Sequence, residues 1–321
     1  KKVDLIVHNG TIYTMGDNVG KASSFVVDNG KFIAVGGDEL LKTYKANKVL
    51  DLQELPVYPG FIDSHCHFLS LGLSLQEVDL YGTRSFDEVI GRVKDFAKNK
   101  DLRAIVGRGW DQNDWKEKSF PNKTILDELF PNIPVALRRI DGHALLVNQK
   151  AFDLAGINSE TKVQGGTILK ENGRLTGILV DAPMKLITDI LPKPTIDEKV
   201  RALKDAEKMS FENGLTTVSV AGLNKDDIYI IDSLQKSGEL SIRVYAMISN
   251  NEDNIAHFLL NGPITTDKLN VRSFKIYADG ALGSRGAALK SDYSDLKKHR
   301  GSFITSKDSL ENLAYKLAST S

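Results

Sequence analysis

The chain is poor in several features that would narrow its function class at once. It has one cysteine, Cys66, in 321 residues, which excludes an intrachain disulfide framework and any zinc site built of cysteines alone. Its charge is balanced, with 42 Lys and Arg against 42 Asp and Glu, so it offers no electrostatic footprint for nucleic acid or an anionic membrane. No apolar run approaches the roughly 20 residues of a membrane span.

What remains is the composition of a soluble globular protein, with 41% hydrophobic and 26% charged residues. The sequence starts Lys-Lys-Val-Asp, without an initiator Met or an apolar signal core. We therefore expect a trimmed N-terminus, which leaves the compartment open between the cytoplasm and a bacterial cell envelope. Histidines number only six, so their positions are informative.

The first part of the chain predicts β structure. Two Asn-Gly pairs, Asn9-Gly10 and Asn29-Gly30, each separate two short apolar runs, which is the typical pattern of a β-hairpin. The predicted strands are residues 4–8, 11–14, 24–27, 31–35, 48–52 and 56–65.

From about residue 85 helices and strands alternate. Ser85 with Glu88 and Thr195 with Glu198 form capping boxes that predict two helix starts. Further helices are expected at 225–237, 252–260 and from 306, and strands at 103–108, 134–140, 215–221, 241–248 and 271–278. This alternation predicts βαβ units and a parallel sheet.

The parity of the side chains, meaning which of the even and odd positions of a strand are apolar, narrows the fold class further. In strand 241–249 the even positions are apolar and the odd positions largely polar, and in strand 271–278 the same division holds from Ser273 onward. A sheet covered by helices on both faces would be apolar on both. A polar inner face instead fits an α/β barrel whose active site lies at the carboxyl ends of its strands.

His65, Cys66 and His67 stand at the carboxyl end of the predicted strand that begins at Pro56. Residues i and i+2 of a strand point to the same side, so the two imidazoles would converge and suit a divalent metal. Cys66 would point the other way. A chance His-x-His pair is the alternative.

Lys275 lies inside a predicted strand on the polar parity. A buried ammonium group is costly, so it is either paired, for example with Asp279, or used chemically. It could form a Schiff base with a substrate carbonyl, or it could react with CO₂ to give a carbamate that bridges two metal ions.

Five segments together resemble the amidohydrolase superfamily, in particular its YtcJ-like and N-substituted formamide deformylase-like branch. They are Pro59-Gly-Phe-Ile-Asp-Ser-His-Cys-His67, Gly107-Arg-Gly-Trp-Asp111, Asp141-Gly-His-Ala-Leu-Leu-Val-Asn148, Gly173-Arg-Leu-Thr-Gly177 and Phe274-Lys-Ile-Tyr-Ala-Asp-Gly-Ala-Leu-Gly-Ser284.

The resemblance implies an α/β fold: a (β/α)₈ TIM-type barrel, about half of it in this chain, beside a small N-terminal β-sandwich. Residues 1–56 would belong to the sandwich and residues 57–321 to the barrel, with an insertion at about 76–195. His65, His67 and a carboxylated Lys275 would be metal ligands. The later histidine ligands and the catalytic aspartate of such a barrel have no counterpart up to Ser321, so we expect a truncated chain that is inactive alone.

Four residues are predicted to contact substrate at the barrel mouth: Trp110, Asp111, His143 and Arg285. Three of them have an ordinary alternative, which is local packing for Trp110, a helix cap for His143 and a plain loop position for Arg285.

The expected function is hydrolysis of a non-peptide carbon–nitrogen bond by water that one or two divalent ions activate, zinc being the favoured metal. A Schiff-base lyase using Lys275 and a non-catalytic binding module are the alternatives. The expected partner is a small amide-type substrate, without nucleic acid or a membrane span, and a homo-oligomer is left open.

Overall fold

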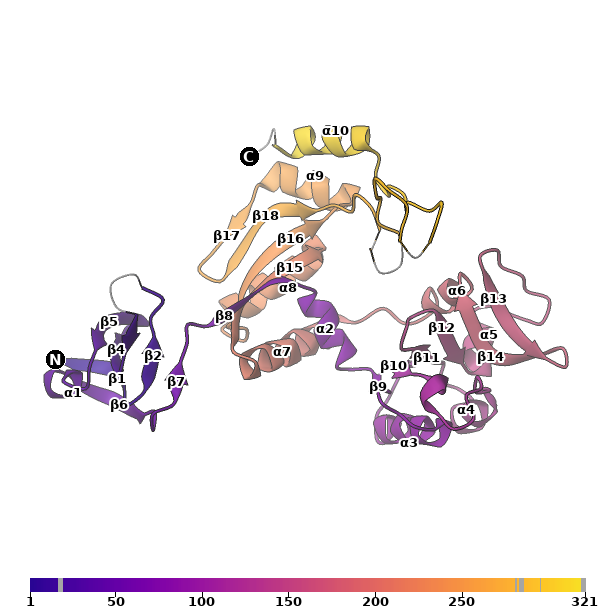
Figure 1. Ribbon diagram of the computed structural model, residues 1–321. Coiled ribbons are helices and arrows are strands. Elements are labelled where there is room, and N and C mark those ends of the chain that lie inside the picture. Colours follow the sequence, from indigo (N-terminus) through magenta and orange to yellow (C-terminus); the bar gives the residue numbers. More distant parts are fainter. Residues whose placement is uncertain (17–19, 281, 283–285, 295, 319–321) are drawn as a thin grey trace. The chain divides into compact units, whose positions relative to one another are not determined.

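The N-terminal part of the chain forms two small sheets (Figure 1). The structure is a computed structural model that describes residues 1–16, 20–280, 282, 286–294 and 296–318. One sheet has the order β5-β4-β1-β6 and the other the order β3-β2-β7. A core of Val3, Ile6 and Val26 lies in the four-stranded sheet. The elements are β1 (Lys2–His8), β2 (Thr11–Tyr13), β3 (Lys21–Ala22), β4 (Ser24–Asp28), β5 (Lys31–Gly36), α1 (Leu40–Thr43), β6 (Lys45–Asp51) and β7 (Pro56–Val57).

Only one of the two Asn-Gly pairs makes a hairpin. Asn29 and Gly30 both have positive φ angles, 51° and 71°, and they join the antiparallel strands β4 and β5 as predicted. The hairpin prediction at Asn9-Gly10 is wrong, because β1 and β2 belong to different sheets. The backbone at Gly10 lies close to the Leu52 side chain, since a side-chain carbon at Gly10 would lie 2.3 Å from Leu52 Cδ1.

The predicted parallel sheet combines β8, from the first half of the chain, with strands from its second half. Its order is β17-β18-β16-β15-β8, and all its pairings are parallel except that of the short edge strand β17. The alternation of helix and strand is that of an α/β protein, while the closed barrel and the sandwich stay predictions. The elements are β8 (Phe61–Cys66), α2 (Phe68–Ser74), α7 (Ile196–Glu212), β15 (Leu215–Leu223), α8 (Lys225–Lys236), β16 (Arg243–Ser249), α9 (Glu252–Asn261), β17 (Ile264–Thr265), β18 (Leu269–Lys275) and α10 (Lys307–Ala318).

Burial along β16 follows the predicted parity, with Val244, Ala246 and Ile248 buried and the residues between them less so. In β18 a register shift opposite Ala246 and Met247 leaves Arg272 unpaired. This bulge reverses the parity, so Leu269 and Val271 are buried before it, while Phe274 pairs with the buried Ile248 after it.

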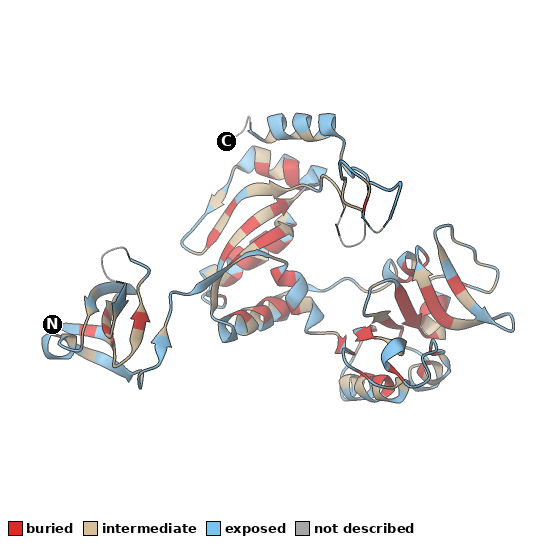
Figure 2. Ribbon diagram, viewed as in Figure 1, coloured by how far each residue is buried: buried red, intermediate tan, exposed pale blue. Residues whose placement is uncertain are grey.

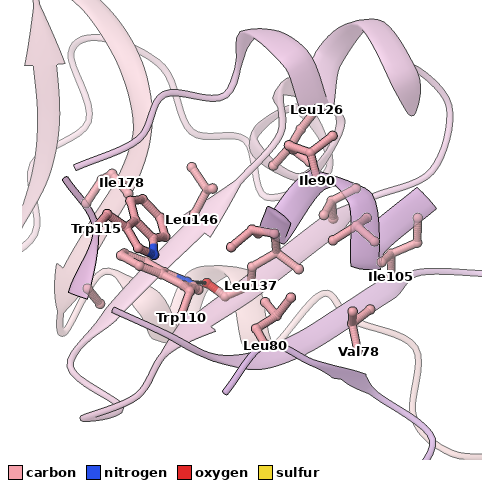
Figure 3. Packing of buried hydrophobic residues seen from close by; sticks show 14 residues of the cluster. Val78, Leu80, Ile90, Ile105, Trp110, Trp115, Leu126, Leu137, Leu146 and Ile178 are labelled. Carbon is pink, nitrogen blue, oxygen red and sulfur yellow. Dashed lines mark hydrogen bonds between the residues drawn. The ribbon is translucent and has the colours of Figure 1, made fainter. Parts of the chain in front are cut away.

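Between α2 and α7 the chain builds a six-stranded mixed sheet in the order β13-β14-β12-β11-β10-β9. Its central strands are buried along most of their length (Figure 2). Hydrophobic clusters cover both faces: Leu137 and Leu146 belong to one cluster (Figure 3), and their strand neighbours Ala136 and Leu145 belong to the other. The elements are β9 (Val78–Asp79), α3 (Phe86–Ala97), β10 (Ile105–Trp110), η1 (Gln112–Asp114), α4 (Thr124–Leu129), β11 (Val135–Arg139), β12 (Ala144–Val147), α5 (Gln149–Leu154), β13 (Gly166–Glu171), β14 (Arg174–Asp181) and α6 (Met184–Thr188).

Both predicted helix starts form, but only Thr195 and Glu198 make the full reciprocal capping box, because the Glu88 carboxylate accepts from the Arg84 amide and not from that of Ser85. The Glu88 amide donates to Ser85 Oγ at 3.1 Å. The Glu198 amide donates to Thr195 Oγ1 at 3.2 Å, and the Thr195 amide donates to Glu198 Oε2 at 2.6 Å. These bonds satisfy donors that a helix N-terminus otherwise leaves without partners.

The chain divides into two compact units. One consists of Lys1–Cys66, Met209–Ile228 and Ser241–Ser321, and the other of His67–Lys208 and Tyr229–Leu240. Within the described ranges, no helix combines the length and the apolar character needed to cross a membrane.

Candidate metal centre and substrate-contact residues

His65 and His67 lie on either side of the end of β8. His65 is on the strand, and its amide donates to Asp63 Oδ1 at 3.0 Å. The strand ends at Cys66, so His67 is not a strand residue but the N-cap of α2, with φ −124° and ψ 71°. Cys66 pairs in register with the buried Val220. Both histidine side chains are exposed.

Lys275 is the last residue of β18 and pairs with Ser249 of β16. It lies over Gly222 of β15, because a side-chain carbon there would lie 3.8 Å from Lys275 Cβ and 3.3 Å from Ser249 Oγ. Its Nζ is 5.1 Å from the centre of the Tyr277 ring. The Asp279 carboxylate accepts a bond from the Ala288 amide, and no ion pair joins Lys275 to a carboxylate within the described residues.

His65 and Lys275 therefore lie at the same end of one sheet, the end where its parallel strands have their carboxyl termini. β8, β15, β16 and β18 run parallel, so their carboxyl ends meet at the same edge. In α/β barrels this is the edge where catalytic groups gather. The described part of the chain holds no group of three or more His, Cys, Asp or Glu side chains arranged to bind a metal ion.

Trp110 lies inside the core of the six-stranded sheet (Figure 3). Its side chain has no exposed surface, and its Nε1 donates to the Leu137 carbonyl at 2.8 Å. The ring of Trp115 lies 6.0 Å away, centre to centre. This burial contradicts a substrate contact in this structure and supports local packing.

Asp111, the next residue along the chain, forms an ion pair with Arg139. Its Oδ1 accepts bonds from the Asn113 amide at 2.9 Å and from Arg139 Nη2 at 2.5 Å. Arg139 also reaches Asp141 Oδ2 at 2.5 Å and Gln112 Oε1 at 2.8 Å. The Asp111 carboxylate thus has a structural role that leaves one oxygen for other contacts.

His143 forms an exposed pair with Asp181. Its Nδ1 lies 2.7 Å from Asp181 Oδ1, and the Asp181 amide donates to the His143 carbonyl at 3.0 Å. The hydrogen bond and charge of Asp181, with a further contribution from Asp141, raise the pKa of the His143 imidazole. The ring is 69% exposed, so its Nε2 remains accessible for a ligand. Arg285 lies outside the described residues.

Comparison with known proteins decides the family. Residues 48–319 match the model of the amidohydrolase family. The chain belongs to the amidohydrolase family. The putative amidohydrolase YtcJ of Bacillus subtilis is 30% identical over 97% of this chain and 60% of its own length. The N-substituted formamide deformylase of Arthrobacter pascens is 29% identical over 57% of this chain and 35% of its own length.

The fold has a solved counterpart in an uncharacterized metal-dependent hydrolase from Pyrococcus horikoshii. That structure superimposes with a TM-score of 0.78 at 28% sequence identity, over 98% of this chain and 63% of the other. The chain spans 56% and 60% of two curated relatives that it matches over nearly its full length. These matches confirm the predicted resemblance to YtcJ-like amidohydrolases and the mixed α/β fold.

Sequence reasoning missed three charged residues of this amidohydrolase chain. Arg108 and Arg138 pair in register on β10 and β11, and both lower the pKa of the partly buried Glu77, against a larger rise that burial causes. Their signal was present in the sequence, since each is a charged residue that directly follows a run of largely apolar residues within its strand. Only the strand register shows that they are neighbours.

Proposed function

We propose that the protein to which this chain belongs is a metal-dependent hydrolase of a non-peptide carbon–nitrogen bond of the amide or formamide type. The family supports hydrolysis, the names of two relatives support an amide-type bond, and one solved neighbour is described as metal-dependent. The observation that carries the proposal is the place of His65 and Lys275, at the carboxyl ends of parallel strands in one sheet.

The proposed ligands are His65, His67 and Lys275. Two imidazole nitrogens suit zinc and other borderline divalent ions. Lys275 would take part as a carbamate: its neutral amine adds to the carbon of CO₂, a proton leaves the nitrogen, and the new carboxylate supplies two oxygen ligands. The carbamate and its two oxygens are suited to bridging two ions.

The donor types fit a divalent ion, but the set is incomplete. Zinc in proteins usually takes four ligands, and no group of three or more acidic, His or Cys side chains is assembled in the described residues. Water, substrate or groups outside these residues would have to complete the coordination. When bound, a divalent ion would lower the pKa of a water molecule to about 7 and polarise the scissile carbonyl.

Asp111, His143 and Arg285 are proposed to contact the substrate. His143 is suited to this because Asp181 holds Nδ1 and leaves Nε2 exposed. In its protonated form it donates a hydrogen bond to a carbonyl or carboxylate oxygen of the substrate, and the pairing with Asp181 favours that form. No residue of this chain is assigned as the catalytic base.

Zinc binding tests the ligand assignment directly. We expect the protein to which this chain belongs to lose bound zinc, measured by elemental analysis after gel filtration, when His65 or His67 is replaced by alanine. His257→Ala on α9 is the matched control and should not change the zinc content. Equal zinc content in all three variants would refute the ligand assignment.

A second experiment tests the lysine and the reaction. With ¹³C-labelled bicarbonate, wild-type chain should show a carbamate carbon resonance that Lys275→Ala removes and Lys268→Ala keeps.

The longer protein should hydrolyse members of an amide and formamide panel and lose activity with a chelator. If borohydride with substrate inactivates it and a chelator does not, the Schiff-base alternative replaces this proposal. If it binds ligands without turnover, the chain is a binding module.

A further inference from the structure

A cavity lies on one face of the six-stranded sheet, where β10 begins. Ala104 and Val106 line it and are half-buried, whereas Ile105 between them belongs to the core on the opposite face. Val106 pairs in register with Ala136 of β11, which belongs to the hydrophobic cluster formed with α5 and α6. That cluster extends to Leu191, which packs against it and also lines the cavity. Apolar surface of the sheet is therefore left open at β10.

The cavity has the size and lining of a small-molecule site. Its volume is about 780 Å³, and such sites typically measure about 300–1,000 Å³ and are lined mainly by apolar groups. Besides the sheet, its apolar walls include Leu73 of α2, Phe96 of α3, and Leu102 and Pro192 from connecting segments. All its lining residues lie within residues 73–205, in one of the two compact units.

Contacts of Glu198 hold two walls of the cavity together. Gln76, which follows α2, donates from Nε2 to the Glu198 carbonyl at 2.9 Å. Arg103, which precedes β10, donates from Nη2 to Glu198 Oε2 at 2.8 Å and to the Lys193 carbonyl at 3.2 Å. The N-terminus of α7 is thus bound both to the end of α2 and to the segment before β10. Because the protein's own groups make these links, the cavity is preformed and a ligand has little ordering of its walls to offset.

Charged side chains of both signs also line the cavity. They are Lys100, Arg103 and Arg201 against Glu77, Asp101, Glu198 and Asp205. Arg103 and Glu198 form an ion pair, and Lys100 Nζ lies 3.6 Å from the centre of the Phe96 ring. A ligand with a net charge would therefore meet groups of like charge as well as groups of opposite charge. An uncharged ligand avoids this repulsion and still finds hydrogen-bond donors and acceptors.

We propose that this cavity binds an uncharged small molecule with an apolar body and one polar group, such as a hydroxyl. The apolar body contacts Leu73, Val106 and Leu191, and its transfer from water drives binding. The polar group hydrogen-bonds to the charged side chains. The site uses none of the proposed metal ligands or substrate-contact residues, so its failure and that of the proposed hydrolysis are distinguishable.

Calorimetric titration with naphthalenemethanol, carried out on the protein to which this chain belongs, tests the site. We expect millimolar or tighter binding with a negative heat-capacity change, which marks burial of apolar surface. Val106→Phe adds bulk inside the cavity and should weaken binding by about tenfold. Leu154→Phe makes a similar apolar change at an exposed position of α5 and is the matched control, which should leave the affinity unchanged. Naphthoate and naphthylmethylamine, the charged analogues, should bind more weakly than the alcohol.

Three results would overturn the proposal: no binding of naphthalenemethanol, equal weakening by Leu154→Phe, or tighter binding of either charged analogue. Should Val106→Phe fail to fold, methyl NMR spectra of the wild-type protein replace it. Naphthalenemethanol should then shift the methyl resonances of Leu73, Val106 and Leu191 before those of other residues, and uniform shifts would refute the site.

Discussion

Replacing Asn148 tests how the six-stranded sheet is held together. The side chain is fully buried and caps α5. Its Oδ1 accepts bonds from the amides of Val135 at 3.0 Å and Ala151 at 3.1 Å. Its Nδ2 donates to the carbonyls of Phe130 at 2.8 Å and Ile133 at 2.9 Å. One amide group thus satisfies four backbone groups from a loop, a strand and a helix.

The expected cost follows from what Asn148→Ala leaves behind. Val135 and Ala151 are fully buried, so their amides would lose their partner without gaining water, at about 1–3 kcal/mol each. The two carbonyls belong to half-buried residues and can reach water at a smaller cost. We expect the free energy of unfolding to fall by about 3–5 kcal/mol in total.

Asn148→Asp separates the two halves of this network. The new side chain keeps the accepted bonds but turns a carboxyl oxygen toward two carbonyls. Because the ionised form is disfavoured there, the pKa of the carboxyl would be higher in the folded state than in the unfolded state, about 3.9. The folded state then binds more protons, so this variant should be closest to wild type at acid pH and lose stability as pH rises above about 4.

The assay is urea unfolding followed by tryptophan fluorescence. The chain has two tryptophans, and both Trp110 and Trp115 lie in the core of this sheet, so the signal reports on the right unit. Ser85→Ala is the matched control, since Ser85 caps α3 with one accepted bond and should cost about 1 kcal/mol. If Asn148→Ala costs no more than Ser85→Ala, the network argument is wrong.

Further predictions concern single contacts. Trp110→Phe removes the indole hydrogen bond to a β11 carbonyl and should lower the free energy of unfolding by about 1–3 kcal/mol in the same assay. An alanine at Gly72 would place its Cβ 1.9 Å from a backbone oxygen of α7, so this variant should melt well below wild type. Gly91→Ala on α3, which meets nothing within 4 Å, should be neutral or stabilising by up to about 1 kcal/mol. Asp181→Asn should lower the pKa of His143 in an NMR titration, because the aspartate raises it. The pair's stabilisation is complete below the unfolded pKa of about 6.5 and disappears as pH rises through the folded value, so the stability difference between wild type and variant should shrink over that range.

Local signals in the sequence predicted much of the fold. The capping residues Ser85 and Thr195 locate two helix starts because their bonds are made within four residues of chain. The alternation of strands and helices, which is also visible in local sequence patterns, predicted the parallel sheet. The hairpin at Asn9-Gly10 failed because the turn is local but the pairing is not: the partners of β1 are β4 and β6.

Sequence patterns predicted the candidate-site residues only where these lie at the ends of strands. Parity placed Lys275 on the polar face of β18 because the count began at Ser273, beyond the bulge at Arg272. A count from Leu269 would have placed it on the buried face. A bulge changes parity without a clear signal in the sequence, so the orientation of a functional side chain can be read only from its nearest neighbours along the strand.

Residues of one sequence motif have separate physical roles in this structure. The segment Asp141–Asn148 contains an aspartate that binds Arg139, a glycine with positive φ, an exposed histidine and a fully buried asparagine. The first and last hold backbone and side chains in place, and only the histidine presents an accessible ring nitrogen. Trp110 gives the same lesson, because its indole N–H is used within the core. A loss of activity on mutation at such positions therefore indicates a chemical role only where the free energy of unfolding is unchanged. The unfolding measurements at Asn148 and Trp110 are for this reason the necessary reference for any kinetic effect at His143.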